Sequence, residues 1–196
     1  MKKINDFLIY ITVAIGVFFL IKAVGDNNAS RILVSLSIIP IMFFPRIARS
    51  LFHVHLPQKI EFVYLMFVVF AQLIGSVFNV YNMIWWYDSF THLISGSLTA
   101  VLALMVMVWM NSYTKKNIIF NILFMFAFSL TSAGIWEIFE FTSDCLLNGD
   151  TQNVLTTGVT DTMIDIIYAT VGTLIVCITY YIEEKRSKLP LMNKLL

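Results

Sequence analysis

Charged residues are scarce in this chain of 196 residues, since Asp, Glu, Lys and Arg together make up only 13% of it. An average soluble domain has about 25% charged and roughly 45–50% apolar residues. Here 59% of the residues are apolar and the mean hydropathy is +0.81. A water-soluble globule of this size could not hide so much apolar surface. The composition therefore excludes a soluble enzyme, a disordered chain and a nucleic-acid binder.

Cysteine is also scarce, with only Cys145 and Cys177 in the sequence. We expect the first in an outer loop and the second deep in the last apolar segment, so the two lie too far apart in depth to pair. This excludes a disulfide scaffold. The H-E-x-x-H, C-x-x-C and EF-hand patterns of metal sites are absent, as are internal repeats. What remains is a polytopic membrane protein.

Six apolar segments are each long enough to cross a membrane, which takes about 20 residues of α-helix. Hydrocarbon offers no water to hydrogen-bond the backbone, so segments of this kind form helices. We therefore predict an all-α bundle that forms a single transmembrane domain over residues 1–196. The six predicted helices cover about 6–24, 31–50, 60–80, 89–110, 117–143 and 161–183.

The basic residues predict the orientation of the bundle. Only Lys22 and Arg31 flank the first outer loop, and the other basic residues all lie on the side shared by both termini. Those residues are Lys2, Lys3, Arg46, Arg49, Lys59, Lys115, Lys116, Lys185, Arg186, Lys188 and Lys194. The positive-inside rule then places both termini in the cytoplasm. We expect Arg46 and Arg49 to reach the lipid headgroups, so that membrane lipid is one partner of the chain.

The acidic residues concentrate in the opposite, outer half. Three pairs of ionisable residues lie near the outer ends of the last three segments: Asp88 and His92, Glu137 and Glu140, Asp161 and Asp165. Spacings of three and four put both members of a pair on one helix face. At 1.5 Å per residue, Glu137 lies about 30 Å along its helix, which brings it to the same outer depth as the other pairs.

Small residues follow the ionisable ones at helical spacing. Gly96 lies four residues after His92, and Ala169 and Gly172 lie four and seven residues after Asp165. Small residues line the closely packed faces of membrane helices. The sequence therefore predicts that the ionisable side chains point into the bundle and away from lipid.

Each of these residues also has an ordinary structural explanation. Asp88 and Asp161 stand at helix starts, where a carboxylate caps free N–H groups. His92 can hydrogen-bond a neighbouring helix. Glu137 and Glu140 lie near a helix end whose dipole disfavours anions, and they would be solvated interfacial acids if that helix stopped earlier.

Taken together, five carboxylates and one imidazole would repel one another unless several are protonated or a cation lies among them. Lys22 and Arg31 are the two basic residues that could supply a partner. Carboxylates suit Mg²⁺, Ca²⁺ or Mn²⁺, and a histidine among them also admits Zn²⁺ or Fe²⁺. The predicted cofactor is thus a divalent metal cation. The predicted ligands are Asp88, His92, Glu140, Asp161 and Asp165, with Glu137 as the catalytic general base. The outer loop over residues 144–160 would either cover this site or be a flexible connection.

These motifs resemble those of a known family. Tyr87-Asp88…His92…Gly96, Trp136-Glu137…Glu140 and Asp161-Thr162…Asp165…Gly172 are similar to the YjdF-like family of small bacterial inner-membrane proteins. The likeness extends from the third segment onward. It implies a multi-pass protein of the cell (inner/cytoplasmic) membrane and implies no particular reaction.

Three functions stay open on the sequence alone. The leading hypothesis is a divalent-metal-dependent hydrolase, open to the outer face, that acts on a lipid or lipid-linked substrate entering laterally. The second is a cation- or proton-coupled carrier of a small molecule. The third is a non-enzymatic membrane subunit with a structural cation site.

Overall fold

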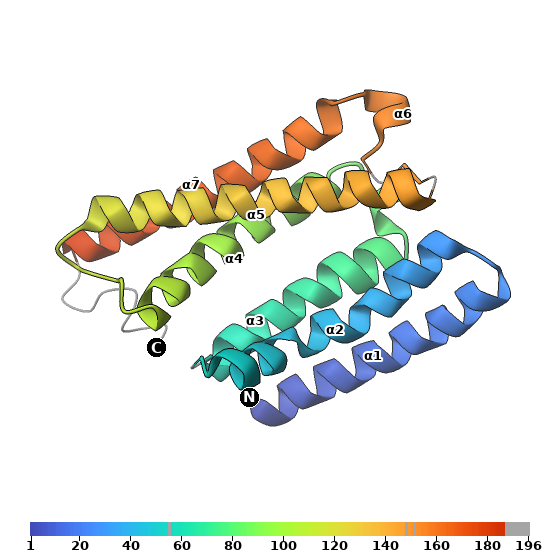
Figure 1. Cartoon of the computed structure of the whole chain (residues 1–196), viewed down its shortest axis with the longest axis horizontal. Coiled ribbons are helices and arrows are strands. Elements are labelled where there is room, and N and C mark those ends of the chain that lie inside the picture. The colour runs from blue at the N-terminus through green and yellow to red at the C-terminus, as the bar shows by residue number, and fades with distance from the viewer. Residues whose placement is uncertain (55, 148, 151, 187–196) are drawn as a thin grey trace. The chain divides into compact units, whose positions relative to one another are not determined.

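The computed structural model describes residues 1–54, 56–147, 149–150 and 152–186, and it confirms the all-α prediction (Figure 1). The structure is 85% helical, and no strand occurs among the described residues. The long helices are α1 (Lys2–Gly25), α2 (Ala29–Phe52), α3 (Gln58–Val68), α4 (Tyr87–Trp109), α5 (Ile118–Leu147) and α7 (Thr160–Arg186). Helix α3 continues as the π-helical segment η1 (Val69–Val77), and η2 (Val80–Asn82) and α6 (Val154–Thr157) are short.

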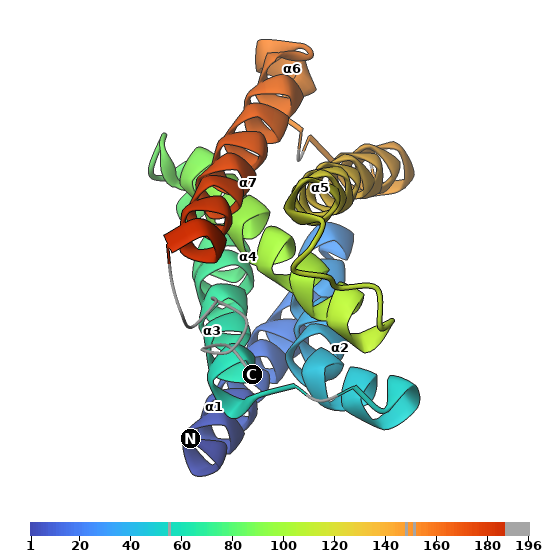
Figure 2. The ribbon, with the colours of Figure 1, turned by 90° about the vertical axis from the view of Figure 1, so that its left-hand side faces the viewer.

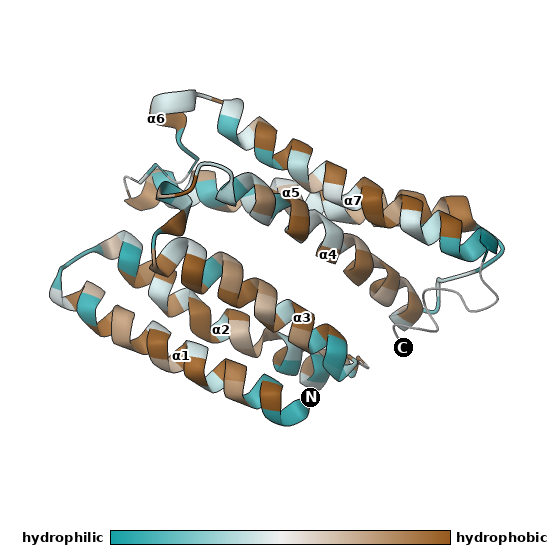
Figure 3. Ribbon diagram, turned by 180° about the vertical axis from the view of Figure 1, so that it is seen from behind, coloured by the Kyte–Doolittle hydropathy of each residue, from teal (hydrophilic) through white to brown (hydrophobic). Residues whose placement is uncertain are grey.

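Six helices are long and apolar enough to cross a membrane, with α3 and η1 taken as one. In the apolar stretch of each of these helices, only 17–39% of the residues are buried. Apolar residues therefore cover much of the outer surface of the helices, as Figure 3 shows, and lipid is the solvent that suits them. The cytoplasmic location of both termini stays a prediction. Lys188 and Lys194, which contribute to that prediction, lie outside the described residues.

The observed helix limits differ from the predicted ones by a few residues. Helix α2 begins at Ala29 because the side chain of Asn28 accepts a hydrogen bond of 2.9 Å from the backbone N–H of Arg31. Helix α5 ends at Leu147, beyond the predicted limit at residue 143. Glu137 and Glu140 are consequently within this helix and not at its last turn.

The chain folds into two compact units, Met1–Tyr87 and Asp88–Leu196. The first unit contains α1, α2, α3 and η1 around a core of Ile9, Ile38, Met42, Leu65, Val68 and Leu73. The second contains α4, α5 and α7 (Figure 2), with a core of Ala100, Ala103, Leu104, Met107, Met125, Cys177 and Tyr180. All three pairs of ionisable residues belong to the second unit. That the whole chain acts as one domain stays a prediction.

Helices α4 and α7 touch through their backbones. A Cβ atom added to Gly96 would lie 2.0 Å from the carbonyl oxygen of Ala169, and one added to Gly172 would lie 2.0 Å from that of Leu93. Only glycine fits at both positions. This contact sets the distance between Asp88 and His92 on α4 and the acids on α7.

A cluster of three hydroxyl groups ties α5 to the other two helices. The Oγ of Ser129 lies 2.6 Å from Oγ1 of Thr99 on α4 and 2.7 Å from Oγ1 of Thr173 on α7. Ser129 is also 3.1 Å from the carbonyl oxygen of Gly96. Hydroxyl groups inside a membrane protein need such partners, because lipid cannot satisfy them. The hydroxyl cluster therefore fixes α5 beside the α4–α7 contact, two turns below His92.

Candidate metal centre

Asp88, His92 and Asp165 form a group of three side chains that could hold a metal ion. One ligand atom from each lies within 4.8 Å of the other two. The Nε2 atom of His92 is 3.5 Å from Oδ1 of Asp88 and 3.8 Å from Oδ2 of Asp165. Two ligands of a tetrahedral metal at about 2.1 Å lie roughly 3.4 Å apart. The observed spacing thus fits a divalent cation with small side-chain movements.

Burial divides the three ligands into a closed and an open side. The side chain of His92 is 9% exposed and that of Asp165 is 4% exposed, whereas Asp88 is 32% exposed. A buried carboxylate is costly without a hydrogen-bond donor or a cation. Asp88 is thus the member of the group that is most accessible from outside the unit.

Glu137 provides an independent sign that a cation or donor belongs here. The residue is 6% exposed, and its Oε1 atom is shielded from solvent without a hydrogen-bond partner in the described part of the chain. Its other carboxylate oxygen lies 3.4 Å from Nε2 of Gln152. The Glu137 carboxyl also interacts electrostatically with His92 and Asp88. The donor set and this orphaned oxygen together fit a divalent metal ion.

Glu140 and Asp161 belong to the same charged cluster but have other partners. The indole Nε1–H of Trp136 donates to Oε1 of Glu140 at 2.9 Å, and the side-chain amide of Asn153 donates to Oδ2 of Asp161 at 2.7 Å. Both carboxylates interact electrostatically with His92. The structure therefore gathers all six predicted residues in one place but groups only three at ligand distance. Metal ligation by Glu140 and Asp161 stays a prediction.

The outer loop is anchored on this cluster. The backbone N–H of Gln152 donates to Oδ2 of Asp144 at 3.0 Å, and its side chain donates to the carbonyl oxygen of Glu137 at 3.1 Å. Asn153 adds the hydrogen bond to Asp161. For residues 144–160 the sequence left two alternatives, a loop that covers the site and a flexible connection. These contacts favour the first. Gln152 and Asn153 were not predicted from the sequence. Two adjacent amide side chains in a loop next to the acidic residues could have indicated them.

No lysine or arginine occurs in the sequence between Lys59 and Lys115 or between Lys116 and Lys185, so His92 is the only basic side chain in the parts of α4, α5 and α7 that carry the acids. Lys22 and Arg31, the partners considered from the sequence, belong to the first unit. Within the second unit, the charge of the cluster can be met by protons on His92 and on the carboxylates, or by a metal ion.

Comparison with known proteins identifies the family. A family model described as "Predicted membrane protein (DUF2238)" matches residues 7–186. A protein of Thermotoga maritima, described as an uncharacterized protein, is 25% identical over 136 residues, which cover 66% of this chain and 66% of that relative. No solved structure matches. Because the family model covers all six helices and the charged cluster, the chain belongs to the DUF2238 family of predicted membrane proteins.

Proposed function

We propose that this protein binds a divalent metal ion at Asp88, His92 and Asp165 and uses it to hydrolyse a lipid or lipid-linked substrate. One observation carries the proposal. A group of three ligand atoms within 4.8 Å interacts electrostatically with the buried carboxylate of Glu137, which has one oxygen without a hydrogen-bond partner among the described residues. Three protein ligands, an open side and a nearby carboxylate are the arrangement of a hydrolytic metal site.

The roles of the side chains follow from their positions. A bound divalent ion would polarise a carbonyl or phosphoryl group and make water more acidic. Glu137 accepts the proton of the attacking water at Oε1, and Gln152 holds the other oxygen in place. Glu140 and Asp161 add negative charge that attracts the cation and are further candidate ligands. Asp88, as the most exposed ligand, marks the side from which substrate enters.

Apolar side chains around the cover favour a lipid substrate. Leu146 is 76% exposed, Leu155 is 86% exposed and Val159 is 69% exposed, and all three flank or belong to the outer loop. Exposed side chains of this kind suit contact with the membrane. With both termini in the cytoplasm, as the basic residues predict, the site would face the outer side of the cell membrane. Location in the cell membrane agrees with the resemblance to the YjdF-like family. Membership of that family is part of this proposal.

The packing of the second unit favours a one-sided site over the carrier alternative. Below the hydroxyl cluster, Leu104, Met107 and Met125 are at most 1% exposed and belong to a continuous apolar core. A carrier needs a polar path through this region in at least one of its states. Met125 and Cys177 lie between the hydroxyl cluster and the next buried polar pair, Asn121 and Tyr180, so an apolar layer interrupts a polar path along α5 and α7.

Metal analysis tests the binding site first. Purified protein in detergent, loaded with Zn²⁺ or Mn²⁺ and then desalted, should retain about one ion per chain by mass spectrometry of the metal. Asp165→Asn and His92→Gln should lose it, and the control Asp26→Asn, in the first outer loop, should retain it. A wild-type protein without metal, or an Asp165→Asn variant with unchanged metal content, would overturn the proposal.

Hydrolysis tests the chemistry separately. Metal-loaded protein should cleave at least one of three probes: p-nitrophenyl phosphate, p-nitrophenyl butyrate or phosphatidylglycerol in vesicles. Glu137→Gln should keep the metal and lose this activity, because only the proton acceptor is removed. Retained metal with no cleavage of any probe would contradict the enzyme and support the structural-cation alternative. Gradient-driven ion uptake by proteoliposomes would support the carrier.

A further inference from the structure

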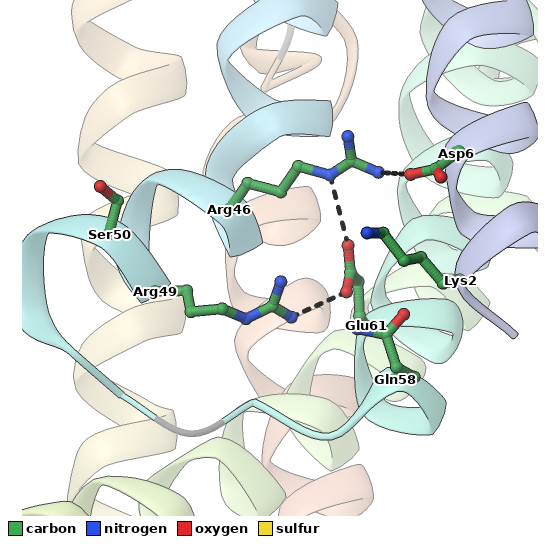
Figure 4. Close-up of a pocket in the computed structure, with 7 residues that line it drawn as sticks. All are labelled: Lys2, Asp6, Arg46, Arg49, Ser50, Gln58 and Glu61. Carbon is green, nitrogen blue, oxygen red and sulfur yellow. Dashed lines mark hydrogen bonds and ion pairs between the residues drawn. The ribbon is translucent and has the colours of Figure 1, made fainter.

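The first unit contains a polar cavity at the predicted cytoplasmic ends of its helices (Figure 4). The cavity has a volume of about 360 Å³, and its lining includes Lys2, Asp6, Arg46, Arg49 and Glu61. These residues come from α1, α2 and α3, and none of them belongs to the unit that holds the candidate metal centre. The cavity therefore calls for its own explanation.

Glu61 organises the cavity from within. Its side chain is 2% exposed, and its two oxygens lie 2.8 Å from Nη2 of Arg49 and 3.6 Å from Nε of Arg46. Arg46 in turn forms an ion pair with Asp6. The two acids thus hold both guanidinium groups in fixed positions along the cavity wall. Arginines free to extend into the headgroup region, as the sequence predicts, would not be ordered in this way.

Positive charge remains after these pairs are counted. Lys2, Arg46 and Arg49 carry three positive charges, and Asp6 and Glu61 carry two negative ones. In the described part of the chain Lys2 makes no ion pair, and Figure 4 shows its ammonium group directed towards Glu61 and Arg46. Arg49 uses only Nη2, for Glu61 and for the carbonyl oxygen of Leu56, among the described residues. A guanidinium group has five N–H donors, so Arg49 keeps several for a ligand.

The shape and location of these donors indicate a phosphate ligand. A guanidinium fork matches the oxygens of a phosphate, and an ammonium group adds a point charge beside it. Basic pockets between membrane helices on the cytoplasmic side are typical sites for phospholipid headgroups. Exposed apolar residues, Phe7 at 65% and Leu51 at 66%, lie on the same ends of α1 and α2, where acyl chains would run.

We propose that this cavity binds the phosphate group of an anionic phospholipid through Lys2 and Arg49, in the leaflet that faces the N-terminus. The bound headgroup neutralises the excess positive charge of the cavity and links α1 to α2 and α3. This site is independent of the proposed hydrolysis. Its loss would leave metal binding at Asp88, His92 and Asp165 unchanged.

The experiment measures protection against thermal unfolding in detergent. Phosphatidylglycerol, phosphatidylcholine and inorganic phosphate are titrated separately onto the full chain. Phosphatidylglycerol should raise the unfolding temperature saturably, and phosphatidylcholine should not. Equal protection by inorganic phosphate would support the phosphate site and assign it a soluble ligand. Protection by neither phosphatidylglycerol nor phosphate, or equal protection by phosphatidylcholine, would overturn the proposal.

Matched charge variants locate the binding. Lys2→Gln and Arg49→Gln should each weaken the apparent affinity for phosphatidylglycerol at least tenfold. Lys59→Gln removes the same charge from an exposed position at the same end of the helices, and should weaken it less than twofold. Lys2→Gln breaks no ion pair among the described residues, so its effect is separable from misfolding. An equal effect of Lys59→Gln and Lys2→Gln would show general surface attraction and refute the site.

Discussion

Gly96→Ala should destabilise the second unit, although alanine is the better helix former. The new Cβ would lie 2.0 Å from the carbonyl oxygen of Ala169 and 2.6 Å from its carbonyl carbon. These are backbone atoms of α7, which cannot rotate away as a side chain can. Overpacking of this kind costs about 1–3 kcal/mol, and the backbone contact points to the upper end. The higher helix propensity of alanine offsets about 1 kcal/mol of this cost. The expected net loss is therefore about 2 kcal/mol.

Thermal unfolding of the purified protein in detergent measures this loss, which corresponds to about 4–8 °C by the scaling for globular domains of similar size. Gly134→Ala on α5 is the matched control, because nothing lies within 4 Å of a Cβ at that position. It should be neutral or stabilising by up to about 1 kcal/mol. Separation of α4 from α7 should also weaken metal binding, since His92 and Asp165 belong to different helices. If Gly96→Ala proved as stable as Gly134→Ala, the close α4–α7 contact would be refuted.

Three further substitutions test other parts of the structure. Ser129→Ala should lower the free energy of unfolding by about 0.5–1.5 kcal/mol, because it removes the hydroxyl shared by Thr99 and Thr173, which both keep a backbone carbonyl as partner. Ser132→Ala is the control in the same unfolding assay, because among the described residues the Ser132 hydroxyl donates only to Phe128 of its own helix. Glu61→Gln should destabilise by about 1–3 kcal/mol, since it weakens the hydrogen bond between this buried side chain and the part-exposed guanidinium of Arg49, and an unchanged unfolding temperature would contradict this. Gln152→Ala should speed hydrogen exchange in the outer loop with little change in global stability, because it removes the contact with Glu137.

The six helices could be predicted because each span carries its own signal. An apolar run of about 20 residues has one stable state in a membrane, whatever it later packs against. The limits of the helices depend on local contacts that composition does not contain. The start of α2 depends on a single hydrogen bond that the backbone N–H of Arg31 donates to the side chain of Asn28, and α5 runs past its apolar stretch to Leu147.

The charged cluster could be predicted because its members lie at helical spacing near the same helix ends. The spacing of four between Asp88 and His92 is local, and a common depth follows from counting residues along each span. Which carboxylate completes the group could not be predicted. Asp165 reaches His92 because Gly96 and Gly172 let α4 and α7 touch, and the contact joins residues far apart in the sequence.

The ion pairs of Arg46 and Arg49 with Asp6 and Glu61 could not be predicted from the sequence. Asp6 and Arg46 are separated by 40 positions, and neither helix alone indicates that they meet. From the sequence, arginine near the end of a span is most simply explained by the lipid headgroups. The side chain of Glu61, also near a helix end, is buried, so its ion pairs with the two arginines are part of the packed interior of the first unit.

The two units neutralise buried carboxylates differently, and this contrast supports a cation at the charged cluster. Glu61 is almost fully buried and lies against Arg46 and Arg49, so side chains of its own unit supply the positive charge. Asp165 and Glu137 are buried to a similar degree, yet the sequence gives their helices no lysine or arginine between Lys116 and Lys185. One imidazole cannot neutralise five carboxylates. The remaining charge must be met by protons or by a metal ion, and the converging ligand atoms of Asp88, His92 and Asp165 suit a metal ion.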